Sequence, residues 1–260
     1  TLLLPSRDKT NGCAFVAPQP LFDPSIRSLA SWAPPDKVAH PRPNNTRSAV
    51  LPGFFVTGTD TEVGKTLASA WLLTQLDAAY WKPIQAGVVP TTDSATVQRL
   101  AELPASRILP EAYLLSEPMA PHESARRANI VLDMEKIKLP PQDKLVVVEG
   151  AGGLMVPIAG GAFMIDLADS LELPIILVAR STLGTINHTL LSLEAIRRRG
   201  LPLAGVVISG PETPHNRAAI ERFGQVDVIA EIPFLETINR ETLKAITPEL
   251  DLLKLATVRP

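Results

Sequence analysis

From Gly53 onwards, short apolar runs alternate with longer stretches in which apolar residues recur every three or four positions. The short runs are rich in β-branched and aromatic residues, as buried strands are, and the longer stretches are typical of helices with one apolar face. Strands are predicted at 54–56, 78–81, 145–148, 174–179, 203–209 and 226–232. Helices are predicted at 67–76, from 92 or 93 through 103, at 164–171, 184–199 and 215–223, and within 240–253. This alternation predicts an α/β fold with a doubly wound, mostly parallel sheet flanked by helices, which binds ligands at the carboxyl ends of its strands.

Two parts of this region lack a clear period. Residues 84–87 are expected to lead into a loop, and residues 104–142 are expected to be irregular apart from a short helix at 133–137. Prolines interrupt this second part at several positions. No internal repeat is visible along the chain.

Residues 1–52 differ from the rest. They contain nine of the 25 prolines and six basic residues against three acidic ones, and no period lasts more than a few residues. Such a stretch cannot bury enough apolar surface to offset its chain entropy. We interpret it as a disordered or loosely attached extension before a domain at 53–260. An organelle transit peptide and a wrongly assigned start are alternative interpretations, whereas Leu2–Leu4 is too short for a secretory signal.

Composition narrows the functional classes. At 260 residues and 45% hydrophobic content, the chain suits one domain with a proper core, alone or with a tail. The net charge of −2 points to neither nucleic acid nor a membrane surface, and no apolar run reaches the roughly 18–20 residues of a membrane span. Cys13 is the only cysteine, which rules out a disulfide framework and fits a reducing cytoplasm.

The sequence GFFVTGTDTEVGKT, residues 53–66, reads as strand, glycine loop, Gly-Lys-Thr and helix start. This is the phosphate-binding loop, in which backbone N–H groups and the helix dipole converge on one point. Lys65 would add a charge for the β- and γ-phosphates, and Thr66 a hydroxyl for Mg²⁺. Five residues separate Gly58 from Gly64, one more than the strict motif allows. We read the loop as a variant with room for ligand contacts by Asp60, Thr61 and Glu62, the alternative being a chance Gly-Lys-Thr.

Three further charged residues stand at or after predicted strand ends. Glu149 follows Leu145–Val148 directly, as a Walker-B carboxylate does, and the Gly-Ala-Gly-Gly after it would let backbone approach a phosphate. Lys82 follows the 78–81 strand, and Asp93 stands at a helix start. On spacing alone, Glu149 could instead be a solvated strand cap, Lys82 a surface lysine and Asp93 a plain N-cap.

Several motifs together resemble the dethiobiotin synthetase family, over about residues 53–253. They are TGTDTEVGKT, WKPIQAG, VVEGAGGLMVP, LPIILVARSTLGTINHTLLSLEAI and the IPFL near the end. The resemblance implies a homodimer of P-loop nucleotide hydrolase-like fold, and the single cysteine leads us to expect a cytoplasmic location. It implies an ATP- and Mg²⁺-dependent ligase that converts 7,8-diaminopelargonic acid and CO₂ to dethiobiotin. The reaction passes through a carbamate and a carbamic-phosphoric anhydride, and it is the penultimate step of biotin synthesis.

The resemblance also assigns residues. Lys82 and Lys65 would be catalytic, and Thr66, Asp93 and Glu149 would bind the metal. Thr61, Lys82, Ala86 and Asn187 would contact the substrate, with Asn187 near a site at the subunit interface. The nucleotide would contact Glu62, Val63, Gly64, Lys65, Thr66, Leu67, Asp93, Glu149, Gly150, Ala151, Gly152, Ser209, Gly210, Pro233, Phe234 and Leu235.

This chain departs from the family pattern at two positions. Ala86 stands where the family often has Ser or Thr, so a substrate hydrogen bond would be absent or replaced. Ser209 stands where an adenine-recognising Asn is frequent, which leaves nucleobase selectivity open. We interpret His188, on an otherwise apolar helix face, as a packed core histidine; the alternative is a catalytic group.

Two other functions compete with this interpretation. The first is a ParA/MinD-type ATPase switch. Three features argue against it: Asp60 stands where such ATPases are expected to have a lysine, the WKPIQAG block is present, and the C-terminus lacks a basic amphipathic helix. The second is a cobyrinate-type amidating synthetase, which would need an added glutaminase domain.

Overall fold

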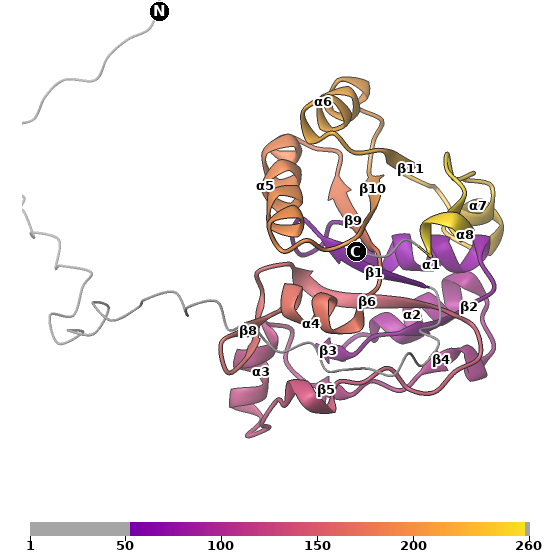
Figure 1. Ribbon diagram of the computed structural model, residues 1–260. Helices are drawn as coiled ribbons and strands as arrows, with labels where there is room; N and C mark the ends of the chain where they lie inside the picture. The colour runs from indigo at the N-terminus through magenta and orange to yellow at the C-terminus, as the bar shows by residue number, and fades with distance from the viewer. Residues whose placement is uncertain (1–52, 258–260) are drawn as a thin grey trace, which may run out of the picture. The chain divides into compact units, whose positions relative to one another are not determined.

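The structure is a computed structural model that describes residues 53–257 (Figure 1). The predictions for residues 1–52 lie outside these residues. Seven strands form one parallel sheet in the order β11-β10-β9-β1-β6-β2-β4. These are β1 (Gly53–Gly58), β2 (Ala78–Trp81), β4 (Ile108–Leu109), β6 (Leu145–Gly153), β9 (Ile175–Arg180), β10 (Leu203–Ser209) and β11 (Val228–Ile232). The predicted doubly wound parallel sheet is therefore confirmed.

Helices cover both faces of this sheet. Strand residues alternate between the faces, so that Phe54 and Val56 enter one apolar cluster and Phe55 the other. The first cluster is completed by α1 (Lys65–Gln75), α2 (Asp93–Ala101), α7 (Arg240–Lys244) and α8 (Leu252–Leu255). The second is completed by α3 (Pro121–Arg127), α4 (Met164–Leu171), α5 (Thr185–Arg198) and α6 (Pro214–Gly224). Strands buried on both faces explain why their sequences read as continuous apolar runs.

The strand order positions the phosphate loop. β1 lies between β6 and β9, so the chain fills one side of the sheet before it crosses to the other. The loop after β1 stands at this crossing point, where open α/β sheets bind their ligands. The ends of β2 and β6 lie on the same side of β1, as Figure 1 shows. Side chains that follow these two strands therefore meet beside the loop.

The structure differs from the predictions in its short elements. Residues 84–86 form β3 (Ile84–Ala86), which pairs with β5 (Tyr113–Leu115) and is not a loop. The stretch predicted to be irregular contains β4, β5, α3 and two 3₁₀ turns, η1 (Ala105–Arg107) and η2 (Met134–Lys136), and η2 lies at the predicted short helix. A hairpin of β7 (Pro157–Ala159) and β8 (Ala162–Phe163) was not predicted, and the last helix is two short ones, α7 and α8. These elements are too short to carry a period, and distant partners fix them.

Candidate active site

The phosphate loop connects β1 to α1. Gly64 immediately precedes α1 with φ of 95°, a left-handed conformation that favours glycine. A Cβ on Gly64 would lie 2.6 Å from the Ser209 hydroxyl oxygen, so only glycine fits against the end of β10. No side chain caps α1, which leaves the N–H groups of its first turn available. A chance Gly-Lys-Thr is therefore excluded as an interpretation, since strand, loop and helix have the geometry of an anion-binding site.

Lys65 is held by backbone. Its ammonium donates to the Asp60 carbonyl oxygen at 2.8 Å, and the residue is 8% exposed. Burial, with the charge of Lys82 as a second cause, lowers the pKa of Lys65 to about 8. The Asp60 carboxylate accepts from the Thr61 N–H at 2.7 Å and pairs with Arg180 at 2.8 Å. These contacts hold the loop together, and among residues 53–257 no carboxylate lies within ion-pair distance of the Lys65 ammonium.

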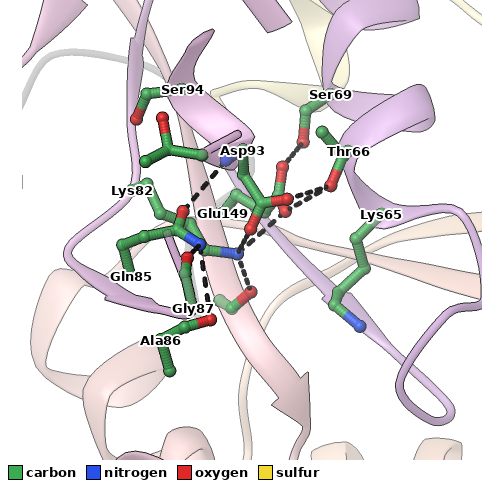
Figure 2. Close-up of polar contacts among 12 residues, drawn as sticks. Lys65, Thr66, Ser69, Lys82, Gln85, Ala86, Gly87, Asp93, Ser94 and Glu149 are labelled. Atoms are coloured by element: carbon green, nitrogen blue, oxygen red, sulfur yellow. Dashed lines mark hydrogen bonds and ion pairs between the residues drawn. The ribbon is translucent and has the colours of Figure 1, made fainter. Parts of the chain in front are cut away.

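Lys82, Asp93 and Glu149 form one ion cluster (Figure 2). The Lys82 ammonium lies 2.8 Å from Asp93 Oδ2 and 2.9 Å from Glu149 Oε1, and it donates to the Gly150 carbonyl at 3.0 Å. The Thr66 hydroxyl donates to Asp93 Oδ1 at 2.9 Å and to Glu149 Oε1 at 3.1 Å. We call these four side chains the carboxylate cluster. The structure therefore brings together the three predicted metal ligands and Lys82, one of the two lysines predicted to be catalytic.

Burial decides among the alternatives that spacing left open. Lys82 is 3% exposed and Glu149 1%, so neither is a solvated surface residue. Thr92 is the N-cap of α2 and accepts from the Ala95 N–H, while Asp93 is the first residue of the helix and points into the cluster. Asp93 is therefore not a plain N-cap.

The two carboxylates set the protonation of the cluster. Burial by itself would lower the pKa of Lys82, but Glu149 and Asp93 outweigh it and hold that pKa above the ordinary value. Burial likewise opposes ionisation of Asp93, but Lys82 and the Thr66 hydroxyl hold its pKa below the ordinary value. Both shifts favour the charged forms of Lys82 and Asp93, which form an ion pair at 2.8 Å.

Three residues of this region were not predicted. Ser69 and Tyr80 donate to Glu149 Oε2 at 2.8 and 3.0 Å, and the Asp93 N–H donates to Gln85 Oε1 at 3.0 Å. Ser69 stands three residues after Thr66, a spacing that places both on one helix face. A tyrosine in an apolar strand needs a partner for its hydroxyl. Those two signals were present in the sequence, whereas Gln85 lies in the short strand β3, which has no sequence signal of its own.

The glycines after Glu149 lie against the phosphate loop. Gly58 and Gly153 are register partners, and a Cβ on Gly153 would come within 3.2 Å of the Gly58 carbonyl oxygen. A Cβ on Gly152, where φ is 65°, would lie 3.6 Å from the Thr61 hydroxyl. The strand continues through these residues as part of β6, which the prediction ended at Val148. Small residues are required here because two backbones approach closely.

The other predicted residues lie outside the carboxylate cluster. β10 ends at Ser209, which lies against Gly64 of the phosphate loop, and the next N–H, that of Gly210, donates to the Ile232 carbonyl. Phe234 after β11 is 83% exposed. Asn187 is exposed in the first turn of α5 and, among residues 53–257, makes no polar contact with the cluster. His188 is half-buried beside a cavity of about 300 Å³ that Thr59, Asp60, Leu191 and Ser192 also line, so it is not a core histidine.

The donor chemistry suits a small hard cation. Thr66, Asp93 and Glu149 offer one hydroxyl and two carboxylates, and within 53–257 no three His, Cys, Asp or Glu side chains gather as a metal centre. Mg²⁺ prefers oxygen and is bound by one or two carboxylates together with substrate phosphates. A site made only of protein ligands would need more donors. The residues therefore fit Mg²⁺ that arrives with a nucleotide.

Fold and site together define a P-loop nucleotide-binding protein. A family model described as an AAA domain matches residues 52–242. The ATP-dependent dethiobiotin synthetase BioD of Paramagnetospirillum magneticum is 54% identical over 75% of this chain and 95% of its own. That of Rhodopseudomonas palustris (strain BisA53) is 46% identical over 75% and 91%. This chain belongs to the dethiobiotin synthetase family, a family of ATP-dependent enzymes.

A solved structure, the cell division ATPase MinD of Pyrococcus furiosus, is similar with 15% identity and a TM-score of 0.48, over 79% of this chain and 97% of that one. In the part of the chain described here, none of the helices combines the length and apolar character that crossing a membrane requires.

Proposed function

We propose that this protein converts 7,8-diaminopelargonic acid, CO₂ and ATP to dethiobiotin, ADP and phosphate. One amine of the substrate adds CO₂ and loses a proton, which gives a carbamate. A carbamate oxygen takes the γ-phosphoryl group, and ADP leaves. The second amine then attacks the carbamoyl carbon, closes the ureido ring and expels phosphate. This is the reaction of the family to which the chain belongs, and relatives named for it share up to 54% of the aligned residues.

The observation that carries the proposal is the buried Lys82 ammonium beside the phosphate loop. Carbamate and γ-phosphate are both anions, so their approach needs concentrated positive charge in a site that excludes water. Lys65 and the first turn of α1 would hold the phosphates, and Lys82 would hold the carbamate and the phosphoryl group in transfer. The substrate brings its own nucleophiles, so positioning and charge suffice for catalysis.

We assign Thr66, Asp93 and Glu149 as the ligands of Mg²⁺. When bound, the ion would neutralise negative charge on the phosphate oxygens while the γ-phosphoryl group leaves ADP. Asp93 and Glu149 now hold the Lys82 ammonium, which already stands where a second positive charge is needed. We expect Lys82 to exchange one carboxylate for the anionic substrate when nucleotide and metal bind.

The remaining assignments follow the same geometry. Glu62, Val63, Gly64 and Leu67 lie on the loop or in the first turn of α1, and Gly150, Ala151 and Gly152 lie beside it. Ser209, Gly210, Pro233, Phe234 and Leu235 would surround the base, and Thr61 and Ala86 the substrate. Asn187, remote from the cluster, would act across a homodimer interface in which α5 of one subunit faces the site of the other. We also propose a cytoplasmic location, since the only cysteine is Cys13.

The test is a turnover assay with diaminopelargonate, bicarbonate, Mg²⁺ and ATP, run on the full chain and on Lys82→Ala. We expect dethiobiotin from the full chain and little from the variant. Failure of the intact protein to form dethiobiotin would overturn the proposal, and substantial activity in Lys82→Ala would overturn the role of Lys82. ATP hydrolysis without the other substrates would favour an ATPase switch instead.

A further inference from the structure

The two oxygens of Glu149 have different partners. Oε1 accepts from Thr66 and lies against the Lys82 ammonium, on the side where nucleotide would bind. Oε2 accepts from the Ser69 hydroxyl at 2.8 Å and the Tyr80 hydroxyl at 3.0 Å. Ser69 and Tyr80 are fully buried, and Glu149 is 1% exposed. One oxygen is thus directed at the site, while the other is bound by side chains that no ligand reaches.

Three elements build this arrangement. Ser69 is one turn after Thr66 on α1, and Tyr80 is on β2, which lies next to β6 with Tyr80 opposite Val147. Tyr80 and Val147 face the same apolar cluster beneath α1, so the tyrosine hydroxyl reaches Glu149 from below the helix. Figure 2 shows the Ser69 and Thr66 hydroxyls on the same side of α1, each directed at the Glu149 carboxylate. The packing of sheet on helix therefore fixes both donors before any ligand binds.

A carboxylate with one free oxygen can rotate about its last side-chain bond. Two hydrogen bonds to the same oxygen remove that freedom, and donors to an ion are worth more than neutral ones. Partners of this kind orient metal ligands, and their removal typically weakens metal binding about 10- to 100-fold.

We propose that Ser69 and Tyr80 are positioning residues that hold Glu149 with Oε1 directed at the metal site. The proposal rests on the proposed role of Glu149 as a ligand of Mg²⁺. Neither residue would contact nucleotide, substrate or metal. Their effect is on the metal requirement of nucleotide binding, because a fixed carboxylate binds the cation without first losing rotational freedom.

The experiment measures how Mg²⁺ tightens the binding of a fluorescent ADP analogue, so no turnover is needed. Tyr80→Phe and Ser69→Ala each remove one hydroxyl and little else. We expect each substitution to raise about tenfold the Mg²⁺ concentration that gives half of the maximal tightening of analogue binding, and the double variant to raise it more than either. Binding of the analogue in EDTA should stay unchanged. Tyr113→Phe and Ser124→Ala are matched controls, because these hydroxyls bond to the backbone oxygens of Asp133 and Glu117, away from the site.

Glu149→Gln tests the metal assignment of Glu149 separately from the positioning role of Ser69 and Tyr80. If Glu149→Gln leaves the Mg²⁺ effect unchanged, the metal assignment itself is wrong. If Glu149→Gln abolishes the Mg²⁺ effect but Tyr80→Phe and Ser69→Ala match the controls, only the positioning role is overturned. Should Tyr80→Phe fail to fold, Ser69→Ala and its control decide the question alone. A loss of affinity in EDTA equal to that with Mg²⁺ would also contradict the proposal, since the hydroxyls would then act on the nucleotide site in general.

Discussion

The phosphate loop and the carboxylate cluster lie side by side, and each holds a buried lysine in an opposite environment. Lys65 bonds to a backbone carbonyl, and its pKa is lowered to about 8 by burial. Lys82 bonds to two carboxylates, which raise its pKa despite burial. Within residues 53–257 the Lys65 ammonium bonds to a carbonyl and not to a carboxylate, so it can bind an anionic ligand without first breaking an ion pair. Lys82 is already paired, so it also stabilises the fold. Both lysines are buried, so their partners, and not their exposure, distinguish their roles.

Replacement of Lys82 should cause the largest loss of stability among these variants. Lys82→Ala leaves Glu149 buried without its cation, and breaking a buried pair costs roughly 3–5 kcal/mol of unfolding free energy. Urea denaturation followed by circular dichroism measures this loss. Because Mg²⁺ would supply a positive charge to the same carboxylates, we expect it to restore more stability in the variant than in the unmodified protein. The control is Lys144→Ala, since Lys144 pairs with Asp77 at the surface, where solvent screens the pair, and its loss should cost far less.

Replacement of Lys65 should weaken nucleotide binding and leave stability intact. In the described part of the chain, the Lys65 ammonium bonds to a backbone carbonyl and pairs with no carboxylate, so its removal leaves no buried charge unpaired. Burial also disfavours its charged form. We expect Lys65→Ala to unfold at the same urea concentration or a higher one. Nucleotide affinity, measured by calorimetry, should fall about 100-fold, the scale of two to three kcal/mol for lost charge-assisted hydrogen bonds. A loss of stability as large as that of Lys82→Ala would erase the distinction between the two lysines.

The outer ion pair of the loop should matter less. Arg180 and Asp60 are joined at 2.8 Å, but their side chains are 38% and 51% exposed. Such pairs contribute about 1 kcal/mol or less and weaken with salt. We expect Arg180→Ala to lower the free energy of unfolding by no more than that, with the difference vanishing near 1 M salt. A salt-independent loss of several kcal/mol would show that the loop depends on Arg180 in another way.

Deletion of residues 1–50 should have the smallest effect. Every residue of the phosphate loop and of the carboxylate cluster lies between positions 58 and 149. We expect activity and melting temperature to stay nearly unchanged in the shortened chain. A large fall in either, measured beside the full chain, would show that the proline-rich stretch docks on the domain.

The long elements could be predicted because each carries its own signal. Leu145–Val148 is a continuous apolar run, and Gly184–Arg199 repeats its apolar residues over several helical turns; β6 and α5 lie there. Glu149 and Lys82 were singled out for a related reason, although spacing alone left their roles open and the family resemblance assigned them. Glu149 and Lys82 follow such runs, and a parallel sheet brings the ends of its strands together.

The rest depends on contacts between distant residues. β3 pairs with β5 across 29 residues, and neither strand has more than three residues to show a pattern. The sequence places Ser69 on the helix face of Thr66 and implies a partner for the Tyr80 hydroxyl, but it names neither partner. Only the packing of α1 over β2 and β6 reveals that both hydroxyls reach one oxygen of Glu149.

The most direct test of the central claim uses ¹³C-labelled bicarbonate with diaminopelargonate, Mg²⁺ and ATP. The account predicts dethiobiotin heavier by one ¹³C in its ureido carbonyl, with one ADP and one phosphate released per product, and a large loss of that signal in Lys82→Ala. ADP and phosphate released without labelled dethiobiotin would contradict it.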